Sequence, residues 1–266
     1  LGDVYKRQYM NAENIAELLM KLSPVKYACD WDNVGMHVGH KDNEINTILV
    51  TLDIDDAAID RAIEINADMI VSHHPLIFHG IKQINDDNIT GRRIMRLIEN
   101  RINAYCMHTN YDCVGGMAHA AASRLSMSED DVLEETCDGE GIGRTGRPEH
   151  SMTAAELCGL VKEKFGLSHV ILYGDELKMI DRISICPGSG KEYTETALKQ
   201  GAQVLITGDM SYHVAADAVA EGLCIIDAGH YGIEHIFIDE IMEYLKENTD
   251  NIEIAGMSYN NPQHFI

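Results

Sequence analysis

Short apolar runs alternate with helical patterns along most of this chain, and that alternation limits the folds available to it. TILVTLD (47–53) and DMIVSHH (68–74) have the composition of buried strands, and DDAAIDRAIEINA (55–67) between them has helical spacing. GRRIMRLIENR (91–101) predicts a further helix, and INAYCMH (102–108) predicts the next strand. Strands separated by helices at this spacing indicate crossover connections and mainly parallel sheets, so we expect an α/β fold.

The alternation is interrupted once, at 126–152, where the sequence is acidic, rich in glycine and poor in large apolar residues. This stretch predicts a linker between two lobes. We expect a first α/β lobe at 10–125, to which 228–266 returns at the functional site, and a second α/β lobe at 126–227. In the second half, strands are expected near 169–173, 180–186, 203–207 and 223–227, and helices near 191–200 and 213–221.

The composition limits the partners and the compartment. The net charge of −22 argues against nucleic-acid polymers and anionic membranes as partners. No apolar stretch approaches the roughly 20 residues that span a bilayer. The seven cysteines are odd in number and contain no C-x-x-C pair, which predicts reduced thiols in a cytoplasmic protein. Residues 1–9 are interpreted as a leader or a cloning remnant outside the fold.

Two glycine-rich motifs resemble nucleotide-binding loops without meeting their requirements. GIGRTG (141–146) fits G-x-G-x-x-G, but it follows an acidic, non-strand stretch and precedes Arg147 and Pro148. A dinucleotide fingerprint needs a strand before it and a helix after it, so we expect a turn here. CPGSGKEY (186–193) lacks both the first glycine and the Ser or Thr of a P-loop.

The second motif can still contact an anion, because exposed N–H groups at a glycine turn before a helix bind negative charge. The predicted substrate contacts are Gly188, Ser189, Gly190, Lys191 and, from an earlier segment, Lys82.

The strongest chemical signal is spread over three segments that each leave an apolar strand. His73 and His74 precede Pro75, which ends a strand because it lacks a backbone N–H. HTNYD (108–112) and GHYGIE (229–234) present further histidines and carboxylates. In α/β proteins ligand sites form beyond the carboxyl ends of the strands, so we expect these segments to meet in a cleft.

The donor types indicate a metal site. Each histidine taken alone is compatible with a hydrogen-bonded structural role, and a Glu four residues after a His is compatible with a surface pair. Together, imidazole and carboxylate without thiolate suit zinc, iron or manganese, and the number of donors exceeds what one tetrahedral ion needs. We therefore predict two divalent ions per chain. The predicted ligands are His73, His74, Asp112, His230 and Glu234.

His108 is assigned a different role from its neighbour Asp112. A carboxylate supplies charge to balance two cations, whereas one more imidazole would crowd a site that needs an open position for water or substrate. We therefore predict that His108 hydrogen-bonds to a metal ligand or to the metal-bound water and, if the protein is an enzyme, is the catalytic residue that acts in proton transfer.

At these residues the sequence resembles the Nif-three-like dinuclear-metal family, whose members are commonly named GTP cyclohydrolase 1 type 2. The resemblance extends over nearly the whole chain from Met10 and implies the same five metal ligands. It also implies a ring-shaped homohexamer. The number of residues between Asp112 and His230 implies the short form of the family, which lacks a central inserted domain. The motifs that carry it are WDNVGMHVG (31–39), SHHPLIFHGIK (72–82), HTNYD, GIGRTG, TGDMSYH (207–213) and GHYGIE.

The family name implies a hydrolase in which a metal-activated water attacks the guanine ring of a nucleotide. Two other functions remain open. One is a metal-binding, metal-delivery or regulatory protein without a dedicated substrate, and the other is metal-dependent hydrolysis of a different phosphoester or nucleotide. An enzyme would use the glycine turn and the lysines, whereas a delivery protein needs no anion site.

Overall fold

The computed structural model describes residues 9–114, 116–258 and 261–263, so the predicted leader at 1–9 lies outside it except for Tyr9. The chain divides into two compact units. Apart from the short segment Lys26–Cys29 and the described residues after Ser258, which belong to unit 2, the chain passes from unit 1 to unit 2 after His108 and returns after Glu240. The expected transitions lay after residues 125 and 227. The first transition comes earlier because the two helices that follow His108 pack on strands of unit 2.

Unit 1 contains a five-stranded sheet and the helices that cover it. Its elements are α1 (Ala12–Leu22), β1 (Gly35–Val38), β2 (Thr47–Thr51), α2 (Asp56–Glu64), β3 (Met69–Ser72), α3 (Ile89–Glu99), β4 (Asn103–Cys106), β13 (Glu253–Gly256) and the second part of α10 (Ile236–Asn248). In the short 3-10 helix η1 (Val25–Tyr27), Val25 belongs to unit 1 and the other two residues belong to unit 2.

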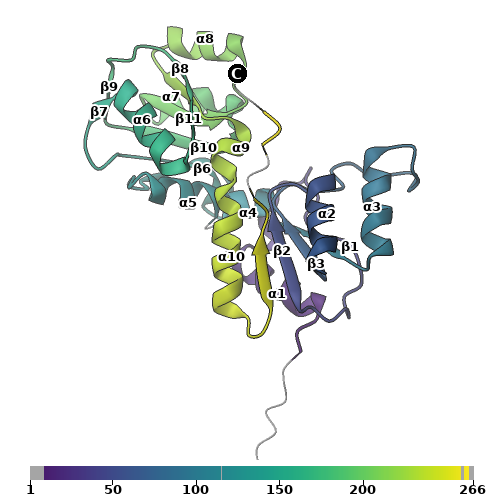
Figure 1. The fold of residues 1–266 in the computed structure, drawn as a ribbon. Helices are drawn as coiled ribbons and strands as arrows, with labels where there is room; N and C mark the ends of the chain where they lie inside the picture. The colour runs from purple at the N-terminus through teal and green to yellow at the C-terminus, as the bar shows by residue number, and fades with distance from the viewer. Residues whose placement is uncertain (1–8, 115, 259–260, 264–266) are drawn as a thin grey trace, which may run out of the picture. The chain divides into compact units, whose positions relative to one another are not determined.

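The strand order in unit 1 is β1-β4-β3-β2-β13, and all pairings except the edge pair β1–β4 are parallel. This confirms the crossover pattern expected from the first half of the sequence. Helices α2 and α3 lie side by side against the sheet (Figure 1). Buried Leu49, Ile70 and Ala104 of the strands pack with Ile59 of α2 and Leu97 of α3 to form the core.

Unit 2 contains a six-stranded sheet, a two-stranded sheet and seven helical segments besides the first part of α10 within the described residues. Its elements are α4 (Thr109–Cys113), α5 (Met117–Arg124), β5 (Asp131–Cys137), β6 (Glu140–Gly146), β7 (Met152–Thr153), α6 (Ala154–Phe165), β8 (Ile171–Tyr173), β9 (Met179–Ile180), β10 (Ile183–Ser189), η2 (Lys191–Tyr193), α7 (Thr194–Lys199), β11 (Val204–Gly208), α8 (Tyr212–Ala220), β12 (Cys224–Asp227) and α9 (His230–Glu234).

The large sheet of unit 2 is mixed, so the prediction of a mainly parallel sheet is wrong for this unit. Its order is β5-β6-β10-β11-β12-β8. In the middle of the sheet, β11 pairs parallel with β10 on one side and with β12 on the other. β5, β6 and β8 pair antiparallel. The core on one side is formed by Leu205 and Ile225 of the strands with Ala197 of α7 and Ala215 of α8.

The predicted linker at 126–152 is also wrong, because most of it forms the β5–β6 hairpin. Asp138 and Gly139 connect the two strands, with φ angles of 53° and 79°. Two successive left-handed residues are what a tight antiparallel hairpin requires, and Asp-Gly is the sequence that favours it. The GIGRTG motif, expected to be a turn, lies within strand β6.

The helices begin where side chains satisfy their first backbone N–H groups. Asp55 and Asn88 each accept a hydrogen bond from the backbone N–H three residues later, at 2.7 and 2.8 Å. Thr153 and Glu156 form a reciprocal capping box at the start of α6, which ends at Gly166 in the left-handed conformation. Among the helices of the described ranges, none is long and apolar enough to cross a membrane.

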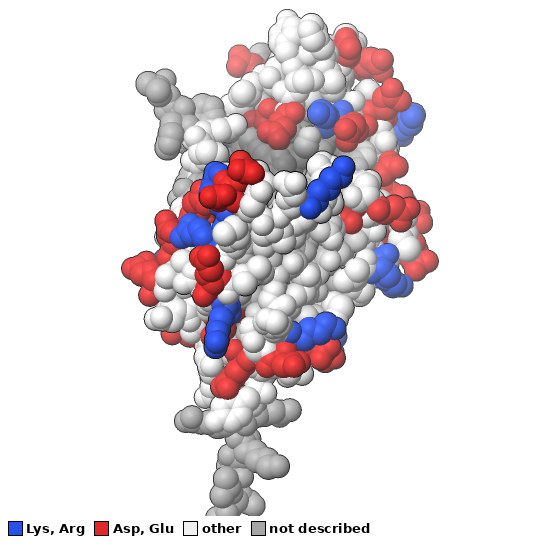
Figure 2. Space-filling model, turned by 90° about the vertical axis from the view of Figure 1, so that its right-hand side faces the viewer, with Lys and Arg blue, Asp and Glu red and all other residues white. Residues whose placement is uncertain are grey.

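Acidic side chains dominate the charged surface. Figure 2 looks onto the side that carries α3, where single Lys and Arg side chains lie among Asp and Glu side chains and uncharged residues fill the centre. Within the described residues, this face carries no broad cluster of Lys and Arg. A surface of this kind offers little attraction to a polyanion.

Candidate metal centre

Three histidines of unit 1 lie together at the ends of two neighbouring strands. β3 ends at Ser72, directly before His73 and His74, and Ser72 pairs with Cys106 near the end of β4. His108 follows β4 by two residues, so it emerges beside the His73–His74 pair. The ring centroids are 5.0 Å apart for His73 and His74, 5.2 Å for His73 and His108, and 5.8 Å for His74 and His108. One ligand atom from each ring lies within 4.8 Å of the others.

Each of these rings uses its Nδ1 atom for a contact with an oxygen acceptor. A backbone carbonyl or an ionised carboxylate only accepts hydrogen bonds, so Nδ1 carries the proton and the lone pair of the neutral ring is on Nε2. Metal-binding histidines are characteristically oriented in this way by an outer acceptor. The contacts are His73 to the Met107 carbonyl oxygen at 2.8 Å, His74 to Asp53 Oδ1 at 2.9 Å and His108 to Asp32 Oδ1 at 2.9 Å.

Unit 2 supplies a further histidine and its carboxylate from α9, as their spacing predicted. Nδ1 of His230 lies 2.8 Å from Asp209 Oδ2, and Nε2 lies 3.0 Å from Glu234 Oε2. A neutral imidazole has one N–H and can donate to only one of these carboxylates. Two carboxylates therefore share one N–H unless a proton or a cation lies between Nε2 and Glu234 Oε2. A divalent metal shared by His230 and the buried Glu234 would satisfy both groups.

Two glycines allow α9 to approach the sheet. Gly188 at the end of β10 has a φ of +70°, and a Cβ atom there would lie 2.2 Å from Glu234 Oε1. A Cβ atom on Gly208 would lie 2.5 Å from the backbone nitrogen of His230. The absence of side chains at these two positions therefore sets where the His230–Glu234 pair lies.

Asp112 lies in the short helix α4, four residues after His108, and is partly buried. The surroundings of Asp112 include the buried thiol of Cys186 in β10. The pKa of Cys186 is raised well above its usual value, first by burial and then by the nearby carboxylates of Asp112 and Glu234. Both predicted carboxylate ligands of unit 2 thus act on the same buried position of β10.

Comparison with known proteins identifies the family of this chain. The chain matches the family described as Duf34/NIF3 (NGG1p interacting factor 3) over residues 10–262. It belongs to the Duf34/NIF3 family. This membership confirms the resemblance drawn from the sequence motifs.

Relatives within the Duf34/NIF3 family match this chain over most of its length. A protein of Clostridium acetobutylicum is 36% identical over 85% of each chain, and one of Clostridium perfringens is 35% identical over 97% of this chain and 100% of its own. Both are named GTP cyclohydrolase 1 type 2 homolog. The solved structure of a hypothetical protein of Staphylococcus aureus has a TM-score of 0.89 and 27% identity, and the match covers 97% of this chain and 100% of that one.

The sequence analysis did not identify the carboxylates that contact the histidine rings, although two of the three lie in motifs that carry the family resemblance. Asp32 lies in WDNVGMHVG and Asp209 in TGDMSYH. Asp53 follows β2, which pairs with β3, so its position at a strand end was visible in TILVTLD. A search for carboxylates at every strand end would have found Asp53 and Asp209.

Two residues of the predicted anion-binding turn make contacts within the protein. Gly188 packs against Glu234, and the Gly190 N–H donates to Thr207 Oγ1 at 2.8 Å. Lys191 lines a cavity of about 520 Å³ in unit 2, whereas Lys82 lines one of about 610 Å³ in unit 1. Substrate contact by these residues and by Ser189 stays a prediction.

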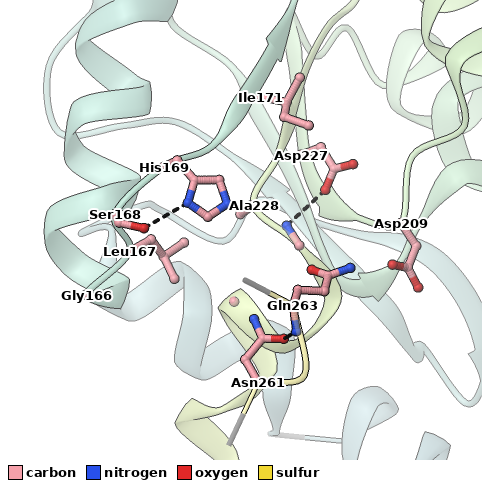
Figure 3. Close-up of a pocket in the computed structure, with 12 residues that line it drawn as sticks. Gly166, Leu167, Ser168, His169, Ile171, Asp209, Asp227, Ala228, Asn261 and Gln263 are labelled. Atoms are coloured by element: carbon pink, nitrogen blue, oxygen red, sulfur yellow. Dashed lines mark hydrogen bonds between the residues drawn. The ribbon is translucent and has the colours of Figure 1, made fainter. Parts of the chain in front are cut away.

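A further cavity in unit 2, of about 410 Å³, adjoins the start of α9, which carries His230 (Figure 3). Asp209, whose carboxylate holds His230, lies on its wall together with Asp227. The Asp227 side chain accepts a hydrogen bond from the Gly229 N–H at 2.9 Å, which fixes the turn before α9. Among the described residues that line this cavity there is no Lys or Arg, so its walls do not favour a phosphate.

The glycine at 188 provides a test of the metal-binding geometry. We expect Gly188→Ala to lower the affinity for a divalent metal about 10–100-fold, the range found when the support of a metal ligand is removed, because the new methyl group displaces the Glu234 carboxylate. The affinity is measured by competition with a chromophoric chelator. Gly222→Ala is the matched control, since Gly222 also has a positive φ, +95°, but no atom lies within 4 Å of the added carbon. Equal affinities of the two variants would contradict the role of Gly188.

Proposed function

We propose that His73 and His74 of unit 1, together with Asp112, His230 and Glu234 of unit 2, bind two divalent metal ions in one centre. The observation that carries this proposal is that each of the three imidazoles directs Nδ1 to an oxygen acceptor, which leaves Nε2 as the metal donor. Three imidazoles and two carboxylates exceed the needs of one tetrahedral ion. The same donors suit zinc, iron or manganese.

The covalent chain supports a shared centre. Asp112 follows His108 by four residues, so their Cα atoms are at most about 14 Å apart whatever the arrangement of the units. The helical conformation of α4 shortens that distance further. The backbone thus limits how far the Asp112 carboxylate can lie from His108.

We further propose that the protein is a metal-dependent hydrolase acting on a nucleotide-like substrate, as the name GTP cyclohydrolase 1 type 2 homolog of its relatives suggests. The bound ions would supply Lewis acidity and lower the pKa of a water molecule for attack on the guanine ring. His108 takes a proton at Nε2 and returns it to the product, while its Nδ1–H stays bonded to Asp32. The carboxylate of Asp32 stabilises the charged imidazolium form in between.

A nucleotide panel tests this proposal. Metal-loaded protein is incubated with GTP and other nucleotides, and formate release and loss of the starting nucleotide are followed. We expect turnover of a purine nucleotide that stops when the metals are removed by a chelator and returns when they are restored. Absence of turnover with every nucleotide, in protein that holds two ions per chain, would contradict the hydrolase assignment.

One observation favours a metal-delivery or regulatory protein as the second candidate. Lys82 and Lys191, the cations expected to bind a phosphorylated substrate, line different cavities in different units. A delivery protein needs no phosphate site. Transfer of bound metal to an acceptor protein faster than its spontaneous release would support this candidate, whereas an enzyme retains its ions through many turnovers.

We also propose that the chain assembles into a closed homohexamer, as the family resemblance implies. Light scattering after size exclusion should give a mass near six times the 29.6 kDa of one chain. The −22 charge of each chain opposes assembly, and salt screens it over a Debye length of about 8 Å at physiological ionic strength. The assembly should therefore loosen at low salt. A monomer at all concentrations and salt levels would contradict the proposal.

The thiols support a cytoplasmic location. Cys29 and Cys137 are partly exposed and the other five cysteines are buried. Burial raises the pKa of Cys113 to about 11 and also raises that of Cys158, which keeps both thiols protonated and unreactive. Buried, protonated thiols are typical of proteins in a reducing compartment.

A further inference from the structure

Two large aromatic side chains of unit 1 lie exposed beside His108. Trp31 is 60% exposed and Phe78 is 42% exposed. Their ring centroids are 5.8 Å apart, and those of His108 lie 6.1 Å from Trp31 and 6.3 Å from Phe78. Burial of an aromatic side chain is strongly favourable, so an exposed pair next to a reactive site indicates a surface that a ligand covers.

The backbone on the C-terminal side of Trp31 is firmly held. The Asp32 side chain is fully buried and its carboxylate binds His108 Nδ1 at 2.9 Å. The next residue, Asn33, donates from Nδ2 to the Ile77 carbonyl oxygen at 2.6 Å. Trp31 is therefore placed by two contacts of its neighbours, while its own ring remains open to solvent.

A second set of contacts fixes the segment that carries Phe78. The Ile77 N–H donates to Nδ1 of His37 at 3.3 Å, and Nε2 of the same ring contacts the Asn33 carbonyl oxygen at 3.0 Å. One neutral tautomer of His37, with its proton on Nε2, satisfies both contacts, and burial lowers the pKa of His37 in agreement with a neutral ring. Phe78 also packs edge-on against His79, with ring centroids 4.8 Å apart.

We propose that Trp31 and Phe78 form a stacking platform for the planar base of the substrate, which it presents to the histidines of unit 1. The proposal rests on the nucleotide-like substrate of the proposed function and identifies the residues that position it. The two rings are inclined by 46°, so they form an open platform and not a parallel slot. Stacking uses the face of a base, which every nucleobase has, and leaves its edge available for chemistry.

The platform predicts a particular order of ligands. A purine covers more of an indole ring than a pyrimidine does, so guanosine and adenosine should bind more tightly than cytidine. A sugar phosphate without a base should not bind to the platform.

Trp31 provides a direct probe, because it is the only tryptophan of the chain. Metal-loaded protein is titrated with guanosine, and with ribose 5-phosphate as the ligand without a base, while tryptophan emission is followed. We expect saturable quenching by guanosine and none by ribose 5-phosphate. Absence of a saturable response to guanosine, or an equal response to both ligands, would overturn the proposal.

Variants separate stacking from folding. Phe78→Ala should weaken guanosine binding about 5- to 150-fold, the loss expected for one stacking partner, and leave the metal content unchanged. Leu177→Ala, which shortens an apolar side chain that is 72% exposed in unit 2, should bind guanosine like the parent protein. Trp31→Phe should retain most of the affinity by calorimetry. Unchanged affinity in Phe78→Ala would overturn the platform.

These readouts distinguish the platform from the proposed hydrolase. Base binding without turnover in the nucleotide panel would support the platform and contradict the hydrolase. Turnover with a KM that Phe78→Ala does not change would support the hydrolase and contradict the platform. Tryptophan emission that shifts with protein concentration and ignores guanosine would show that another copy of the chain covers this surface, which also overturns the proposal.

Discussion

Replacement of Glu234 by alanine is expected to lower the affinity for divalent metal by more than 100-fold, beyond the roughly 10–100-fold that loss of an outer partner costs. Glu234 is buried, and its Oε2 atom lies 3.0 Å from His230 Nε2. The substitution removes negative charge and a donor atom at once. It also leaves His230 without the carboxylate with which it would share the proposed cation. Competition against a chromophoric chelator measures the loss.

Two further variants make this result specific. Glu234→Gln keeps the size of the side chain but removes its charge, so it should also bind metal weakly while melting close to the parent protein in the metal-free state. Glu163→Ala removes an exposed carboxylate from α6 and should bind metal normally. Parent-like metal affinity in both Glu234 variants would remove this residue from the centre.

Replacement of His108 by glutamine is expected to lower turnover by about 10²–10⁴-fold, the usual contribution of a positioned acid–base group, with two ions retained. Glutamine has similar reach and polarity but no titratable nitrogen. The ring of His108 is 16% exposed and oriented by Asp32, so its Nε2 atom can exchange a proton with a bound substrate or water.

The geometry also fits a second role for His108. Its Nδ1–carboxylate contact is of the kind seen at His74, and its ligand atom clusters with those of His73 and His74. These are the contacts expected of His108 if it were itself a third imidazole ligand in unit 1. If His108→Gln loses a metal ion while Asp112→Asn retains both, the catalytic and ligand roles of His108 and Asp112 are reversed.

The parts of the fold that could be predicted from the sequence are those in which one periodic pattern dominates. Strands β2, β3 and β4 are fully buried short runs, and α2 and α3 between them have a clear apolar stripe. Pro75 indicated where the strand before His73 and His74 ends. The four-residue spacing of His230 and Glu234 predicted a shared helical face, and the structure confirms it.

The predictions failed where a strand is only partly buried or where two residues that contact each other are distant in the sequence. Only one of the seven residues of β5, Leu133, is buried, so its acidic sequence resembles a linker, and only the Asp138–Gly139 pair indicated a hairpin. Strand β1 is four residues long and pairs with β4, far along the chain. Asp32 reaches His108 across 76 residues, a pairing that spacing arguments on a single sequence do not reveal.

The central claim is a centre of two metal ions per chain, and the metal content of the protein tests it most directly. The protein is purified without chelators, incubated with zinc, iron or manganese, freed of excess metal and examined by elemental analysis against its measured concentration. We expect two equivalents per chain for the metal that binds most tightly. One equivalent or less, in protein that is folded and carries all five ligands, would contradict the account.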